Sequence, residues 1–302
     1  MSPMRRVKLL NTFLLGLAGV LFFSAGGGHV LDIDIDPLNT ATAEKYRFDF
    51  ESVRKGPYLN LKSAILVNYD NGQVLFAKNP DKVRPVASIS KLVTAMVVLD
   101  SGVDLDTTEV ITAQDAYRSS RSRLRVGTRM TLRDYLHSTL MSSDNRAARA
   151  LARAVAGSIE EFADLMNEKV KQLGLDKSRF EEPSGLSSKN VSTATEVAKI
   201  LHYANDYPLI AKITSKKRYT LRFLDRPGRR LTIGNTNRII WSAWWVDAGK
   251  TGYIRAADYC LTTLVHNKEG QRLTLVVLGV PGDNLRFKEA RRLLNWGFRN
   301  LS

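Results

Sequence analysis

Ser88 and Lys91 are the first residues along the chain whose types and spacing could do covalent chemistry. A separation of three places both side chains on one face of a helix, one turn apart. A serine hydroxyl is a poor nucleophile until a base removes its proton, and a neutral lysine can be that base. Such a pair occurs about once by chance in a chain of this size. Ser52 and Lys55 form a second pair, which no apolar helix follows, and we interpret it as solvent-exposed.

A second hydroxyl group stands at Ser143, directly before Asp144 and Asn145, where one expected helix gives way to the next. Serine and aspartate are both good helix N-caps, so a purely structural role is one interpretation. The functional interpretation is a hydroxyl and an amide presented to a cleft. The two roles are compatible at one helix start.

A third motif, Lys250, Thr251 and Gly252, lies in an expected strand directly after Gly249. An edge strand protected by lysine is the structural interpretation. Two glycines within a strand weaken it and often mark close approach by a ligand. This favours a substrate-binding strand.

The elements that must position these motifs are strands at both ends of the chain and helices between them. Residue patterns predict strands over 61–69, 73–77, 218–224, 230–233, 244–250, 259–266 and 272–280. They predict helices over 88–99, 131–141, 145–156, 158–174, 193–205 and 287–298. Asn71 and Gly72 predict a two-residue hairpin turn. Because hairpins join antiparallel strands, we expect an α+β fold: an antiparallel sheet with flanking helices and an inserted helical lobe.

The composition restricts the partners of the chain. It has 302 residues, a formal net charge of +15 and a single cysteine, Cys260. The charge favours anionic partners, and one cysteine excludes an intrachain disulfide and a cysteine-based zinc finger. A basic stretch between Arg118 and Arg129 is either a solvated face or a contact with anionic cell wall or a membrane surface.

The first residues have the pattern of a secretory signal peptide over 1–28: a basic head, an apolar run over 9–23 and then small residues. The alternative is an uncleaved anchor, although this run is short for the roughly 20 residues that a membrane span requires. The cleavage position stays open. Residues 29–57 are interpreted as a linker. We therefore expect an exported protein of the periplasm or cell envelope, with no nucleic-acid partner.

The three motifs, S-x-x-K, S-D-N and K-T-G, stand in the order typical of the penicillin-recognising serine enzymes. The chain resembles the low-molecular-mass penicillin-binding proteins, which are serine D-alanyl-D-alanine peptidases. The resemblance covers residues 58–280 and includes the segments 85–91, 122–124, 140–145 and 182–186. It implies that residues 58–302 are a serine D,D-peptidase domain with the antiparallel sheet and helical lobe of that family.

The resemblance also implies catalytic roles. Ser88 would be the acylated nucleophile and Lys91 its base, with its pKa lowered by a nearby cation that Lys250 could supply. Ser143 would relay a proton to the leaving amine. Water would then release the acyl group. The family needs no metal and no organic cofactor.

The remaining motif residues would bind the substrate. Asn145 would hold the substrate amide or position Lys91, and Lys250 and Thr251 would bind a peptide end or the carboxylate of penicillin. The N–H groups of Ser88 and Tyr253, the latter directly after Gly252, would form the oxyanion hole.

The type of enzyme within the family follows from two further features. A class A β-lactamase carries a deacylating glutamate in a Glu-x-x-Leu-Asn loop, which this sequence lacks, whereas Glu182-Pro-Ser-Gly185 matches the peptidases. The family's carboxypeptidases usually add a β-rich domain, and the residues after Lys250 suffice only to finish the sheet and one helix. We expect a D,D-endopeptidase that cleaves peptidoglycan cross-links and binds β-lactam antibiotics. A carboxypeptidase is the alternative, ahead of a β-lactamase or a non-catalytic penicillin sensor.

Overall fold

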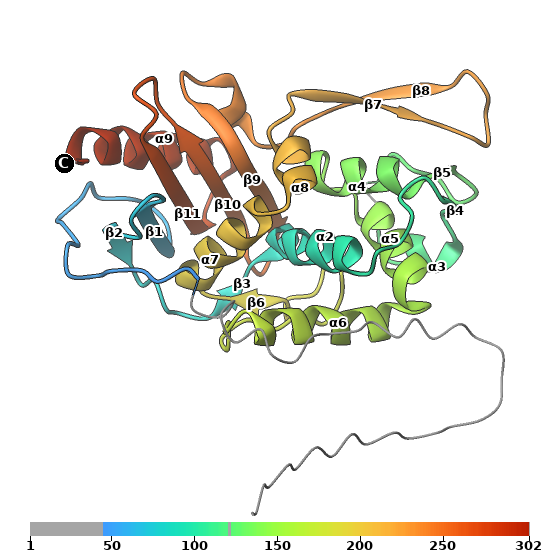
Figure 1. Ribbon diagram of the computed structural model, residues 1–302, viewed down its shortest axis with the longest axis horizontal. Helices are drawn as coiled ribbons and strands as arrows, with labels where there is room; N and C mark the ends of the chain where they lie inside the picture. The colour runs from blue at the N-terminus through green and yellow to red at the C-terminus, as the bar shows by residue number, and fades with distance from the viewer. Residues whose placement is uncertain (1–44, 120–121, 302) are drawn as a thin grey trace, which may run out of the picture. The chain divides into compact units, whose positions relative to one another are not determined.

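An antiparallel sheet lies at the centre of the described residues, 45–119 and 122–301 of the computed structural model (Figure 1). Its strands run in the order β2-β1-β11-β10-β9. The expected signal peptide and residues 29–44 lie outside the described residues. The strands are β1 Ser63–Asn68, β2 Val74–Lys78, β9 Trp245–Ile254, β10 Asp258–His266 and β11 Arg272–Val280.

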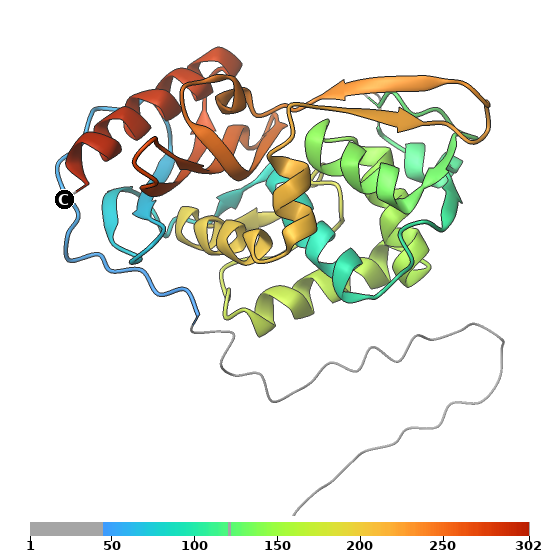
Figure 2. The same cartoon turned by 45° about the horizontal axis from the view of Figure 1, so that its top comes forward.

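Both faces of the sheet are buried, each under helices. Side chains alternate along a strand, so Ile65 belongs to the core on one face and Leu66 to the core on the other. Helix α9, Asp283–Asn300, covers the Leu66 face, and α7, Ala194–Asn205, contributes to the Ile65 face (Figure 2).

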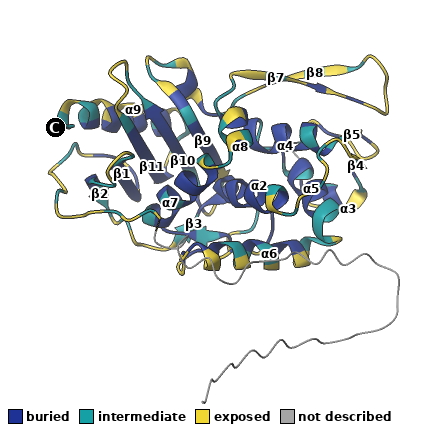
Figure 3. Ribbon diagram, in the orientation of Figure 1, coloured by how far each residue is buried: buried dark blue, intermediate teal, exposed yellow. Residues whose placement is uncertain are grey.

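A helical lobe is inserted between β2 and β9. It begins with the 3-10 turn η1, Ala87–Ser90, which runs directly into α2, Lys91–Asp100. Residues 91–98 of α2 are all buried, so this helix forms the centre of the lobe (Figure 3). The other helices are α3 Ala113–Ala116, α4 Leu132–Met141, α5 Asn145–Ala156, α6 Ile159–Gln172 and α8 Pro208–Thr214.

Three small two-stranded sheets complete the described part of the chain. The longest, β7 with β8, projects beside α4, where the ring of Tyr219 stacks on His137 with 3.7 Å between their centroids. The short elements are β3 Arg84–Pro85, β4 Thr108–Val110, β5 Arg129–Thr131, β6 Val191–Ser192, β7 Arg218–Arg222, β8 Arg230–Gly234 and the 3-10 turn η2 Arg238–Trp241.

The expected α+β architecture is confirmed, as are the helix starts read from capping residues. Ser158 and Thr193 are N-caps, whose hydroxyls accept from the N–H groups of Glu161 and Glu196, each at 3.1 Å. Among the described residues, no helix is both long and apolar enough to cross a membrane.

The turn between β1 and β2 differs from the expected two-residue form. Residues 69–73 connect the strands, and Gly72, with φ +76, donates its N–H to the Asn68 carbonyl at 2.9 Å. The Asn68 side chain also accepts from the N–H of Asp70 at 3.0 Å. Local side-chain bonds of this kind stabilise the longer turn.

The described part of the expected linker, residues 45–57, is instead packed on the domain. Asp49 pairs with Gln73 in a parallel bridge, and the N–H of Arg54 donates to the Leu75 carbonyl at 3.0 Å. These bonds cover the outer edge of β2, which would otherwise expose unpaired backbone groups. The boundary expected at residue 58 is therefore too late, because folded structure precedes it.

Candidate active site

Three segments that are distant in the sequence bring the motifs to one cleft of about 620 Å³. Ser88 comes from η1 and Lys91 from the start of α2, the second motif lies at the α4–α5 junction, and the third lies in β9. Lys91 and Lys250 are buried, with 0% and 1% exposure. The other predicted site residues all line the cleft: Ser88, Ser143, Asn145, Thr251, Gly252 and Tyr253.

The amine of Lys91 is surrounded by three oxygen atoms. Its Nζ lies 2.9 Å from Ser88 Oγ and 2.7 Å from Asn145 Oδ1, and it also donates to the backbone carbonyl of Ser184. Amide and carbonyl oxygens can only accept hydrogen bonds. The two N–H groups of a neutral amine are therefore directed to Asn145 and Ser184, which leaves the lone pair facing the Ser88 hydroxyl.

The amine of Lys250 contacts the second hydroxyl of the site. Its Nζ lies 2.8 Å from Ser143 Oγ and 2.9 Å from the Thr251 carbonyl. The Thr251 hydroxyl lies 2.6 Å from that of Thr236, which also lines the cleft. Ser143 thus connects a buried amine to the open cleft, where a hydroxyl can pass a proton.

Both amines have lowered pKa values. Burial lowers the pKa of Lys91 from 10.5 to about 7; the carboxylates of Glu182 and Asp144 oppose this effect and Arg149 adds to it. Burial, followed by the charges of Lys91 and Arg286, holds the pKa of Lys250 well below its usual value. A nearby cation, which Lys250 could supply, was expected to lower the pKa of Lys91; burial is instead the largest cause, and the cation that adds to it is Arg149.

The backbone of the α4–α5 junction combines capping with access to the cleft. Asp144 is the N-cap, and its Oδ1 accepts from the N–H groups of Arg146 and Ala147 at 3.0 and 3.1 Å. Ser143 is held at φ +61, a conformation that costs about 1 kcal/mol or more outside glycine. Asp144 therefore makes the cap, while Ser143 and Asn145 on either side of it line the cleft.

Gly252 lets β9 approach η1 closely. A Cβ at this position would lie 2.8 Å from the Val86 carbonyl oxygen and 3.1 Å from the Ser88 nitrogen. Gly185 packs on η1 as well, where a Cβ would lie 2.3 Å from the Ala87 carbonyl oxygen. The glycines of β9 were expected to mark close approach by a ligand, but the group that approaches Gly252 is the backbone that carries Ser88.

The sequence did not predict the residues that support the motif residues through hydrogen bonds to the backbone. Arg286 of α9 is buried and donates to the carbonyls of Gly252 and Cys260 at 3.1 and 3.0 Å, which ties the third motif to the helix. The Ser184 carbonyl was missed because it is a backbone atom. Glu182 and Ser184 lie in a segment that carried the family resemblance, but no role was assigned to them.

The basic stretch is exposed where it is described, at Arg118, Arg123, Arg125 and Arg129; Arg121 lies outside the described residues. Arg123 also lines the cleft. Part of this positive charge therefore lies at the cleft.

The α+β fold and the buried serine–lysine pair define a serine-type peptidase. The chain belongs to the D-alanyl-D-alanine carboxypeptidase family, which it matches over residues 51–282. Both the family and the fold expected from the motifs are thereby confirmed.

Individual relatives agree with this assignment. The D-alanyl-D-alanine endopeptidase of Escherichia coli (strain K12) is 38% identical over 80% of this chain and 78% of its own length. The D-alanyl-D-alanine carboxypeptidase DacA of Haemophilus influenzae is 32% identical over 81% of this chain and 63% of its own length. The crystal structure of the Streptomyces K15 DD-transpeptidase has a TM-score of 0.75 and 27% identity, covering 82% of this chain and 100% of that one.

Proposed function

We propose that this chain hydrolyses D-alanyl-containing peptide bonds of peptidoglycan through an acyl-enzyme on Ser88. The observation that carries the proposal is the position of Lys91 Nζ, 2.9 Å from Ser88 Oγ and bonded to two groups that can only accept. A neutral lysine in this position is oriented to take the serine proton.

The acylation step follows from that contact. Ser88 Oγ attacks the carbonyl carbon of the D-alanyl residue while its proton passes to Lys91. The N–H groups of Ser88 and Tyr253 stabilise the resulting oxyanion, a contribution for which about 2.7–4 kcal/mol per donor is typical. Collapse of the tetrahedral intermediate breaks the peptide C–N bond and leaves an ester on Ser88.

The Ser143 hydroxyl, which Lys250 contacts at 2.8 Å, relays to the leaving amine the proton that Lys91 took from Ser88, so Lys91 becomes neutral again and Ser143 keeps its hydroxyl. Lys250 and Thr251 bind the carboxylate of the peptide end or of a β-lactam, and Asn145 holds both the Lys91 amine and the substrate amide. Water then hydrolyses the ester, so no other reactant is needed.

The substrate we favour is a peptide cross-link, which makes the enzyme a D,D-endopeptidase. The chain spans 78% of the length of the endopeptidases of Escherichia coli and Haemophilus influenzae, against 63% of the carboxypeptidase of Haemophilus influenzae. Release of a terminal D-alanine is the second candidate, supported by the family's name.

A β-lactamase activity is disfavoured by the surroundings of Glu182. Its carboxylate accepts hydrogen bonds from the N–H groups of Ser184, Leu186 and Ser187 and from the Ser184 hydroxyl. A deacylating glutamate must instead be free to take a proton from water. We further propose that the protein is exported and works in the cell envelope, where peptidoglycan lies, with the signal peptide over residues 1–28.

Labelling with a fluorescent penicillin tests the nucleophile. The wild-type protein forms a covalent adduct and Ser88→Ala forms none, whereas Ser52→Ala, in the second Ser-x-x-Lys pair, labels like the wild type. An adduct that persists in Ser88→Ala would remove Ser88 from its role.

Incubation with defined muropeptides tests the substrate. We expect cross-linked dimers to be split into monomers, measured by chromatography and mass spectrometry. Release of D-alanine from uncross-linked pentapeptides, with dimers left intact, would establish the carboxypeptidase instead.

A further inference from the structure

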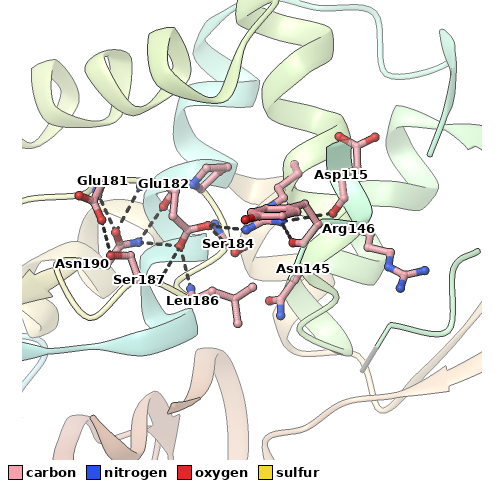
Figure 4. A network of polar contacts seen from close by, with 12 residues as sticks. Asp115, Asn145, Arg146, Glu181, Glu182, Ser184, Leu186, Ser187 and Asn190 are labelled. Carbon is pink, nitrogen blue, oxygen red and sulfur yellow. Dashed lines mark hydrogen bonds and ion pairs between the residues drawn. The ribbon is translucent and has the colours of Figure 1, made fainter. Parts of the chain in front are cut away.

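Glu182 is a buried carboxylate for which the mechanism above has no use. It is 9% exposed. Its Oε2 accepts from the N–H of Ser184 at 2.8 Å and from the Ser184 hydroxyl, and its Oε1 accepts from the N–H groups of Leu186 and Ser187 at 2.7 and 3.3 Å. Figure 4 shows this one side chain bonded to both sides of the turn that follows it.

This turn supplies one of the three oxygen atoms around Lys91. The Ser184 carbonyl accepts from Lys91, and Ser88 Oγ lies 3.3 Å from the same oxygen. The next residue, Gly185, has φ +77 and packs so closely on η1 that a Cβ would lie 2.7 Å from the Ser88 nitrogen. A shift of the turn would therefore move the carbonyl that orients the base.

Two further residues hold Glu182 in place. Asn190 accepts from the N–H of Glu181 at 2.8 Å and donates to the Glu182 carbonyl at 2.7 Å (Figure 4). Arg149 of α5 places a guanidinium nitrogen 4.0 Å from Glu182 Oε2, and both side chains are largely buried. Because α5 begins with Asn145, the same helix supplies the other acceptor of the Lys91 amine.

We propose that Glu182, with Arg149 as its ionic partner, is a positioning residue for acylation. It fixes the turn at Ser184–Ser187 so that the Ser184 carbonyl takes one N–H of Lys91 and the lone pair faces Ser88. The inference rests on the proposed function, because it assigns a role within the same acylation step.

The charges around Lys91 make the role of Glu182 measurable in the pH profile, because its carboxylate raises the pKa of Lys91. The carboxylates facing it belong to Glu182 and to Asp144 at the start of α5, and the cations belong to Arg149 and, from β9, Lys250. Loss of the Glu182 charge lowers the pKa of Lys91 further, whereas loss of Arg149 raises it.

The test is the rate constant for acylation by a fluorescent penicillin, measured for full-length protein between pH 5 and 9. Glu182→Gln keeps the volume, but its amide nitrogen cannot accept from the turn. We expect the plateau rate to fall roughly 10- to 100-fold, as for small misplacements of catalytic groups, and the midpoint of the pH profile to move to lower pH. The matched control is Glu160→Gln, an exposed glutamate in the first turn of α6 and outside the Ser184–Ser187 turn; its rate and profile stay those of the wild type.

Two results would overturn the inference: a wild-type rate in Glu182→Gln, or a reduced rate with an unmoved midpoint, which would indicate only a structural role. If Glu182→Gln does not fold, Arg149→Met decides: loss of the ionic partner of Glu182 must lower the plateau rate and move the midpoint to higher pH, and a wild-type plateau rate refutes the positioning role. Failure of the wild-type protein to label at all would instead refute the proposed function.

Discussion

The two buried lysines of the cleft are the same residue type in different electrostatic surroundings. Burial is the largest cause of a lowered pKa in both. Lys91 faces the carboxylates of Glu182 and Asp144, which bring its pKa back to about 7. Lys250 faces the cations Lys91 and Arg286, which lower its pKa further.

This difference in surroundings suits the two lysines to the two roles proposed for them, a base at Lys91 and a carboxylate-binding cation at Lys250. A base works best when its pKa lies near the working pH, which the carboxylates beside Lys91 achieve. The charges that act on Lys250 are those of Lys91 and Arg286, which are both cations. A bound substrate carboxylate would supply the negative charge that favours the protonated form of Lys250. The identity of the neighbours, and not burial alone, therefore separates Lys91, the proposed base, from Lys250, the proposed anion-binding lysine.

The sharpest test of this comparison replaces each lysine by arginine, which stays protonated. Lys91→Arg removes the base, and we expect the acylation rate constant to fall roughly 10²- to 10⁴-fold. Lys250→Arg keeps a cation for the carboxylate, so its rate should stay within about tenfold of the wild type. Fluorescent penicillin labelling measures both.

Lys55→Arg, at the exposed lysine of the second Ser-x-x-Lys pair, is the control and should label normally. Equal losses in Lys91→Arg and Lys250→Arg would abolish the distinction between the two lysines.

A second prediction concerns the pH dependence of the wild-type protein. In the proposed mechanism Lys91 acts in its neutral form, and its pKa is about 7. The acylation rate should therefore rise about tenfold per pH unit below that value and level off above it. Stopped-flow measurements with a chromogenic β-lactam between pH 5 and 9 test this, and a rate that does not change between pH 5 and 8 would contradict it.

The smallest effect is on stability. Between the folded-state pKa of Lys91, about 7, and its usual value of 10.5, the unfolded chain binds a proton that the folded protein does not. The free energy of unfolding should therefore rise with pH across this range, by at most about 1.4 kcal/mol per pH unit for this group. Lys91→Met should remove this part of the slope in urea unfolding at pH 7.5, 8.5 and 9.5.

The control is Lys189→Met, whose side chain is 77% exposed and whose loss should leave the slope unchanged. A wild-type slope in Lys91→Met would mean that Lys91 is not neutralised by folding.

Local patterns predicted much of the fold. Helix α5, Asn145–Ala156, has the predicted limits, and Ser158 caps the next helix through Glu161 as its spacing indicated. Both follow from interactions within a few residues, which the sequence displays directly. The packing of residues 45–57 was missed because it depends on backbone about 20 residues further along the chain, at residues 72–75. The longer turn takes part in the same contacts, since the Gly72 carbonyl accepts from the N–H of Asp49 at 3.0 Å.

The sequence by itself determined the motif residues and their family, because nucleophile, base and anion-binding strand need particular side chains at particular spacings. Only the tertiary structure decided the electrostatic surroundings of the two lysines. The pKa of Lys91 depends on burial and on Glu182, Asp144 and Arg149, and its orientation depends on the Ser184 carbonyl. Burial, charge separation and backbone position arise only when segments far apart in the chain come together.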